Sequence, residues 1–261
     1  MSVEPGYLLA LYLFLIGSAV GSFLNVVIYR LPRGESIVKP RSHCPHCDTP
    51  IKPYDNILIA SWLLLRGRCR NCKEQISIRY PIVELSTALW FVWMYLQFGL
   101  SWEFAQYLTL GIILLAISMV DLDTKLIPDS VLIVGGVSAL VFAIMGNVIS
   151  LKGSIAGGVV MGGVLLAIAL IGEFVLKKES MGFGDVKLSI MIGLFIGWEM
   201  ALLAIFLSAI FASVISIGGL LMGRMKFGKP FAFGPFLALG AIVSGIWGEG
   251  IMLAYLKWAL G

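Results

Sequence analysis

Long apolar segments constrain this chain more than any other feature of its sequence. A helix needs roughly 20 apolar residues to cross a bilayer. The chain is 59% hydrophobic and 13% charged, whereas soluble domains have about 45–50% apolar and about 25% charged residues. We therefore expect an all-α polytopic membrane protein with about eight transmembrane helices. The candidate spans are residues 7–29, 81–98, 104–120, 131–149, 153–176, 186–198, 200–222 and 231–256.

Positive charges in the loops predict how these spans are oriented. Lys and Arg are enriched in cytoplasmic loops of membrane proteins. With eight spans, one side of the membrane carries 17 of the 19 Lys and Arg residues, and the other carries only Lys152 and Lys257. This asymmetry predicts that both termini face away from the cytoplasm. The loops predicted to be cytoplasmic are 30–80, 121–130, 177–187 and 223–230.

Glycines spaced four residues apart predict close contacts between helices. Such pairs remove side chains from a helix face and let two backbones approach one another. We expect them to serve tight packing. The pairs are Gly153 with Gly157, Gly158 with Gly162, and Gly193 with Gly197.

The four cysteines all lie in the long polar loop 30–80. They form two C-x-x-C pairs separated by 21 residues, Cys44 with Cys47 and Cys69 with Cys72. Four thiolates at this spacing suit a closed, tetrahedral, structural zinc site. Two disulfides are the alternative, but the loop is predicted to face the reducing cytoplasm. We therefore expect a cytoplasmic zinc-binding loop domain between the first and second transmembrane helices.

Two acids are predicted at the cytoplasmic end of the helices. Asp121 follows the third span, and Asp185 begins the sixth. An ionisable residue beside a membrane helix is costly, which favours a functional role. Two carboxylates at one depth suit an aspartyl protease, in which one acts as a base on water and the other, protonated, polarises the scissile carbonyl. A transporter or a non-enzymatic scaffold is the alternative, but proton-relay acids would be spread through the bilayer.

Residues beside the two acids are candidates for contact with a substrate. Gly182 and Gly184 precede Asp185, and glycines leave room for an extended substrate backbone. Asp123 and Asp129 follow Asp121. Asp123 also fits a solvated loop position, and Asp129 fits the N-cap of the fourth span.

Several motifs together resemble those of one family, the bacterial type IV prepilin peptidases, also called leader peptidase/N-methyltransferases. The resemblance covers nearly the whole chain. It includes residues 21–32, the paired cysteines, and the segments 79–84, 121–129 and 182–185. The match implies that the two catalytic aspartates are Asp121, rather than Asp123, and Asp185. The Gly-x-Gly-Asp arrangement also occurs in presenilin-like intramembrane proteases.

The resemblance implies two activities at the bacterial inner membrane. The first is cleavage of prepilins and pseudopilins after a glycine that ends a short basic leader, at the cytoplasmic face. The second is methylation of the new N-terminal amine with S-adenosylmethionine, in support of type IV pilus or type II secretion assembly. A peptidase without the methyltransferase activity is the alternative. We expect prepilins and membrane lipids as partners, and no nucleic acid.

The expected domain organisation follows from these motifs. Residues 1–29 form the first transmembrane helix, and residues 30–80 form the zinc-binding loop. Residues of about 7–98 are associated with methylation. Residues 104–222 form the membrane peptidase domain, and residues 223–261 form a C-terminal transmembrane helix.

The S-adenosylmethionine site has no clear signature in the sequence. No G-x-G-x-x-G follows a predicted strand, so a Rossmann-type cofactor site is not expected. Polar residues at the membrane edges are candidates for the cofactor pocket, with interfacial anchoring as the alternative role. They are Asn25, Arg30, Tyr80 and Glu84.

Overall fold

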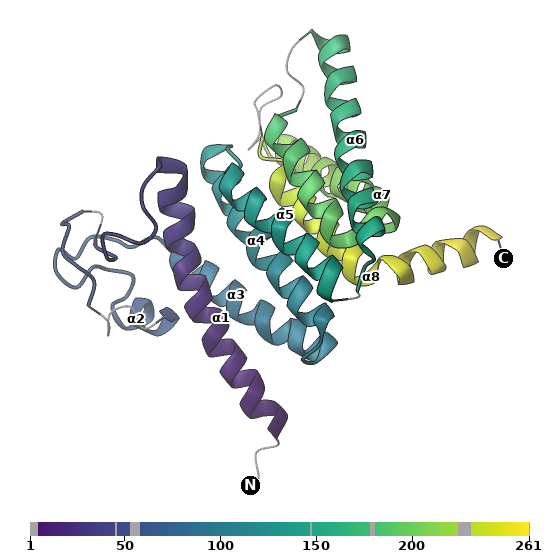
Figure 1. The fold of residues 1–261 in the computed structure, drawn as a ribbon. Helices are drawn as coiled ribbons and strands as arrows, with labels where there is room; N and C mark the ends of the chain where they lie inside the picture. The colour runs from purple at the N-terminus through teal and green to yellow at the C-terminus, as the bar shows by residue number, and fades with distance from the viewer. Residues whose placement is uncertain are drawn as a thin grey trace. The chain divides into compact units, whose positions relative to one another are not determined.

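All the regular elements in the part of the chain that the structure describes are helices (Figure 1). A computed structural model describes residues 5–44, 46–52, 58–146, 148–177, 181–223 and 231–260. These residues contain no β-strand, so the predicted all-α class is confirmed. The elements are α1 (Pro5–Arg30), the 3-10 helix η1 (Leu31–Arg33), α2 (Leu58–Leu64), α3 (Arg79–Phe98), α4 (Trp102–Thr124), α5 (Asp129–Met145), α6 (Leu151–Leu176), α7 (Phe183–Leu221) and α8 (Gly234–Leu260).

The helices have the length and surface of a membrane protein. Five of them, α1, α4, α6, α7 and α8, are long and apolar enough to cross a bilayer, and α5 is a shorter apolar helix. Large apolar side chains such as Val159 and Phe174 face outward on α6. An apolar exterior of this extent suits lipid rather than water. Each of the eight predicted spans overlaps one of the helices α1 and α3–α8, and two of the spans share α7.

Two compact units make up the chain, Met1–Phe104 and Ala105–Gly261. In the first unit α1 packs against α3. Gly17 and Gly21 of α1 lie against the backbone of α3, where an added Cβ atom would stand 2.8 Å from the Cα of Ala88 and 2.7 Å from the Cα of Glu84. Farther along α1, the Asn25 side chain donates to the Tyr80 carbonyl at 3.0 Å. The order of these contacts makes the two helices antiparallel.

A break at Gly197 divides α7 into two helical halves, because φ 77° and ψ 171° at this residue are not helical values. Glycine adopts a positive φ at little cost because it has no Cβ atom. The first half ends beside the start of α4, where the Gln106 side chain donates to the Phe195 carbonyl at 2.8 Å. The sixth and seventh predicted spans are therefore the two halves of this element.

The second half of α7 returns toward the end at which the first half began. Along α8, Gly240 packs against Ser208, and Gly248, which comes later in α8, packs against Met200, which comes earlier in α7. The second half of α7 and α8 are therefore antiparallel. The start of α8 lies beside the last turn of α4. The end of α4 and the starts of α7 and α8 therefore lie together at one end of this unit.

Close packing of α6 on α7 depends on the predicted glycine pairs. Gly157 lies against the backbone of Gly193 and Gly197, and Gly162 lies against Ile190. Here two helix backbones touch, so neither can move aside as a flexible side chain would. The predicted packing role is confirmed for Gly157, Gly158, Gly162 and Gly193, whereas Gly153 faces Ser150 and Ile149 at the start of its own helix.

Gly157→Ala is expected to destabilise the second unit by about 1–3 kcal/mol, the usual cost of overpacking a rigid contact. Gly163→Ala is the matched control on the same helix, because nothing lies within 4 Å of the added methyl group. Thermal unfolding of the purified variants in one detergent measures the difference. Equal melting temperatures for the two variants would contradict the packing role.

Candidate functional site

Asp121 lies in the last turn of α4 and is held by the first residue of α8. The helix ends at Thr124, and Lys125, in the left-handed conformation with φ 55°, donates its N–H to the Asp121 carbonyl at 2.8 Å. This is a common way for a helix to end. The Asp121 side chain is 4% exposed, and its Oδ2 accepts the backbone N–H of Gly234 at 2.9 Å. One of the N–H groups that a helix start leaves unpaired is thereby satisfied by a carboxylate.

Asp185 lies in the first turn of α7, three residues after the N-cap Gly182. Its carboxylate accepts a hydrogen bond from the Gly182 backbone N–H. This is the bond that an acid at the third helical position makes in a capping box. The positive end of the helix dipole also favours a negative charge there.

The fold brings Asp121 and Asp185 together. The two carboxylates lie within range of electrostatic repulsion, although they come from different helices. Asp121 is buried and Asp185 is half-buried. Two acids held by separate backbone N–H groups at one end of a helical unit influence each other's charge, as groups that titrate together do.

The two glycines before Asp185 have different surroundings. Gly184 lies close to Ile127, since an added Cβ atom would stand 3.2 Å from the Ile127 Cβ. This contact brings the segment after α4 beside the start of α7. Gly182 is exposed, and the nearest atom to an added Cβ is the Asp185 Oδ2 at 3.5 Å. The backbone at Gly182 is therefore open to an incoming molecule right beside the acid.

The remaining acids of this segment take different positions. Asp123 is exposed on the last turn of α4. The predicted N-cap role of Asp129 is wrong: the N-cap of α5 is Pro128, without a side-chain capping bond, and Asp129 is the first helical residue. Its carboxylate instead accepts both bonds of an ion pair with Lys187 Nζ, at 2.7 and 2.9 Å. A lysine on α7 offers this acid a stronger partner than the local backbone does.

The four cysteines converge in the first unit. Their sulfur atoms lie within 4.8 Å of one another, and those of Cys44 and Cys72 are 3.8 Å apart. Four sulfurs around zinc at about 2.3 Å stand about 3.8 Å from each other, whereas a disulfide bond is about 2.05 Å long. All four thiols are free. The sulfur cluster therefore has the donor set and the spacing of a four-coordinate metal site.

The two C-x-x-C pairs have the same local backbone structure, so each presents its two sulfur atoms in the same way. In each pair the residue after the second cysteine has a positive φ, 52° at Asp48 and 62° at Lys73. That residue donates its N–H to the carbonyl of the first cysteine, Cys44 at 2.9 Å and Cys69 at 3.0 Å. Hydrogen bonds with the side chain and backbone of Thr49 lower the pKa of Cys47 to about 6. A thiol with a lowered pKa is readily available as the thiolate that a metal binds.

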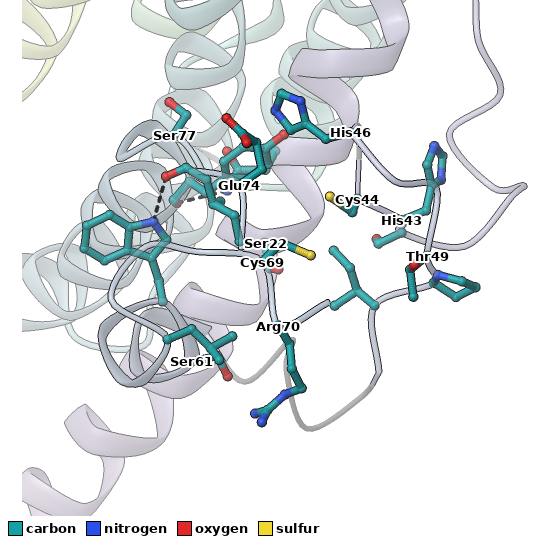
Figure 2. A pocket seen from close by; sticks show the side chains of 18 of the residues that line it. Ser22, His43, Cys44, His46, Thr49, Ser61, Cys69, Arg70, Glu74 and Ser77 are labelled. Atoms are coloured by element: carbon teal, nitrogen blue, oxygen red, sulfur yellow. Dashed lines mark hydrogen bonds between the residues drawn. The ribbon is translucent and has the colours of Figure 1, made fainter. Parts of the chain in front are cut away.

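A cavity of about 510 Å³ lies beside the cysteine cluster, within the first unit. Figure 2 shows Ser22, Cys44, His46, Cys69 and Glu74 among the side chains that line it. The four polar residues singled out at the membrane edges all line it as well: Asn25, Arg30, Tyr80 and Glu84.

Gly234 is the site residue that sequence reasoning missed. The only signal was the Gly-Pro pair at residues 234 and 235 in front of an apolar span. Such a pair predicts the start of a helix but not its partner. The contact with Asp121 uses a backbone N–H, and every residue except proline has one.

Known proteins resemble both units of the chain. Residues 15–98 match the bacterial peptidase A24 N-terminal domain, and residues 108–217 match the type IV leader peptidase family. A protein of Stutzerimonas stutzeri named prepilin leader peptidase/N-methyltransferase is 38% identical, with 94% of this chain and 92% of the relative covered. Proteins of the same name from Aeromonas hydrophila and Pseudomonas aeruginosa are 37% and 34% identical, each over at least 93% of this chain and 92% of the relative. No solved structure matches the chain.

Proposed function

The chain belongs to the type IV leader peptidase family, and we propose that it removes the short basic leader from type IV prepilins and pseudopilins after a glycine. The single observation that supports this most is the meeting of Asp121 and Asp185 at one end of the second unit. That end also contains the open backbone of Gly182. By the charge distribution of the loops, this end faces the cytoplasm at the bacterial inner membrane.

The two carboxyl groups divide the chemistry of hydrolysis between them. The ionised member takes a proton from a water molecule, whose oxygen attacks the carbonyl carbon of the scissile bond. The protonated member donates a hydrogen bond to the carbonyl oxygen, and a proton is then passed to the nitrogen of the leaving amine as the C–N bond breaks. Like charges in close proximity hold one proton on the pair, so that an acid and a base are available together.

Residues around the pair fit a substrate with a basic leader and an extended cleavage segment. Gly182 leaves space for a peptide backbone beside Asp185, whereas the space at Gly184 is taken by the Ile127 side chain. Asp123 is an exposed acid two residues after Asp121, and it adds negative charge on the side of α4 where a basic leader would approach. Asp129 lies near the same segments, and its pairing with Lys187 reduces its charge toward a substrate.

We further propose that the protein methylates the amine which cleavage exposes. S-adenosylmethionine supplies the methyl group as an electrophile bound to a sulfonium sulfur. The carbonyl oxygen of the Asn25 side chain is buried at the cavity of the first unit and accepts no hydrogen bond from the described residues, which is consistent with a polar cofactor in that unit. Assembly of a type IV pilus or a type II secretion system is the process that these two products would serve.

Mass spectrometry of a prepilin after incubation with the purified protein and S-adenosylmethionine tests both activities together. Loss of the leader and gain of one methyl group is the expected result. Loss of the leader alone would leave a peptidase without methyltransferase activity. An unchanged prepilin, in a detergent where the protein remains folded, would contradict the proposed function.

We propose that the cysteine cluster holds a structural zinc ion, so Cys72→Ser is expected to lower zinc affinity by at least about tenfold. Loss of even an outer-shell partner costs 10–100-fold, and Cys72 would be a direct ligand. His46→Ala is the control, because His46 lies outside the group of four sulfur ligands. Zinc content after dialysis at one fixed free-zinc concentration measures the difference. Equal content in Cys72→Ser and the unmodified protein would contradict the site.

A further inference from the structure

The cavity beside the cysteine cluster has the features of a built binding site. Its volume of about 510 Å³ is within the range of about 300–1,000 Å³ that is usual for small-molecule sites. Trp62 and Tyr80 provide aromatic walls. The Trp62 indole N–H donates to the Ile76 carbonyl at 3.1 Å, which fixes the ring in place (dashed line in Figure 2). Rigid aromatic walls of this kind suit a flat heterocycle.

One buried polar atom at this cavity makes no hydrogen bond within the part of the chain that the structure describes. The Asn25 side chain is 4% exposed, and its nitrogen donates to the Tyr80 carbonyl at 3.0 Å. Its oxygen, Oδ1, is buried and makes no hydrogen bond within the described residues. An unsatisfied buried acceptor costs about 1–3 kcal/mol. A ligand that donates a hydrogen bond inside the cavity would remove this cost.

A buried carboxylate lines the same cavity. Glu84, on α3, is 8% exposed and lines the cavity with Asn25. The Ser22 hydroxyl donates to it, and no cation within the described part of the chain interacts with it. A buried charge without an opposite charge is costly. Among the described residues, the cavity thus combines a carboxylate with no cation beside it, an acceptor with no donor, and aromatic walls.

We propose that this cavity binds S-adenosylmethionine, with Glu84 facing the sulfonium and the Asn25 Oδ1 accepting a hydrogen bond from the ligand. The assignment rests on the proposed methyltransferase function and adds where in the chain the methyl donor is held. The positive sulfonium compensates the Glu84 carboxylate, and the adenine matches the aromatic walls. Cys44 and Cys69 also line the cavity. A metal held by the cysteines would therefore stabilise one wall of the cavity.

Calorimetric titration of the purified full chain with S-adenosylmethionine and with S-adenosylhomocysteine tests this site without any turnover. The second compound has a neutral sulfur and is otherwise the same apart from the methyl group. Glu84→Gln should weaken binding of S-adenosylmethionine by at least about tenfold, the effect of one lost bond to a charged group. Its effect on S-adenosylhomocysteine should be less than about threefold. Glu35→Gln is the control, because it removes one negative charge from an exposed position in the same unit. It should leave both affinities unchanged.

The outcomes separate the site from the activity. Unchanged affinity of Glu84→Gln for both compounds overturns the site, and an equal loss of both affinities overturns the pairing with the sulfonium. If the unmodified protein neither binds S-adenosylmethionine nor methylates a prepilin, the methyltransferase function itself fails. Photolabelling of the unmodified protein with an 8-azido analogue of S-adenosylmethionine needs no variant. Label in peptides from residues 22–30 and 61–84 supports the site, and label confined to residues 105–261 overturns it.

Discussion

Asp185→Asn is expected to slow leader removal by roughly a thousandfold or more, the scale of general acid–base catalysis. An amide has nearly the shape of the carboxylate, but it can neither accept a proton from water nor share one with Asp121. Asp121→Asn should have an effect of the same size. Because the two groups act as a unit, the double variant should lose little more than either single variant. Initial rates of prepilin cleavage, followed by mass spectrometry at a saturating substrate concentration, measure these effects.

Glu199→Gln is the matched control for these variants. It removes one negative charge from an exposed position of α7, beyond the break at Gly197, and so should cleave at the normal rate. Calorimetric binding of S-adenosylmethionine in the first unit provides a second control, since loss of an acid in the second unit should not change it. A cleavage rate of Asp185→Asn within about tenfold of the unmodified protein would contradict the two-acid mechanism.

Gly234→Ala is expected to reduce the cleavage rate by about a hundredfold while the fold is kept. The added methyl carbon would stand 2.7 Å from the Asp121 Oδ2, which is too close for the hydrogen bond to remain as it is. Oδ2 is the end of a side chain, so the carboxylate can turn away without a shift of either helix. The cost should therefore appear in catalysis rather than in stability, because displacement of a catalytic group by about 1 Å can cost about a hundredfold.

Gly250→Ala is the matched control for Gly234→Ala. Gly250 lies on the same helix, and nothing lies within 4 Å of an added methyl group there. Both variants should melt within a few degrees of the unmodified protein, and only Gly234→Ala should lose activity. If Gly234→Ala lowered KM and kcat by the same factor, or left both unchanged, Gly234 would not position Asp121.

Features that depend on the type and spacing of nearby residues could be predicted from the sequence. Apolar length predicted helices at every span, because a helix in lipid must pair its backbone groups internally and cover itself with apolar side chains. The glycine pairs predicted the contact of α6 with α7, because absence of a side chain is itself visible in the sequence. Cysteine spacing predicted the convergence of the four sulfurs, since a C-x-x-C turn has few alternatives for its backbone.

Features that depend on distant partners were harder to predict. Asp129 fits an N-cap by residue type, yet a lysine on α7 provides its partner, and no local rule weighs a cap against an ion pair from another helix. The eight predicted spans became seven helical elements because a glycine can turn the chain within one continuous element at Gly197.

From its residues alone the chain can be identified as a helical membrane protein with two acids at the ends of spans and four cysteines in one loop. Those properties follow from the chemistry of side chains, which the sequence states directly. Tertiary structure alone decided that Gly234 holds Asp121, and that Asn25 and Glu84 share one cavity with the cysteines. The physical reason is that these arrangements rest on backbone groups and on helix packing. A backbone N–H is the same in nearly every residue, and only the fold decides which carboxylate it meets.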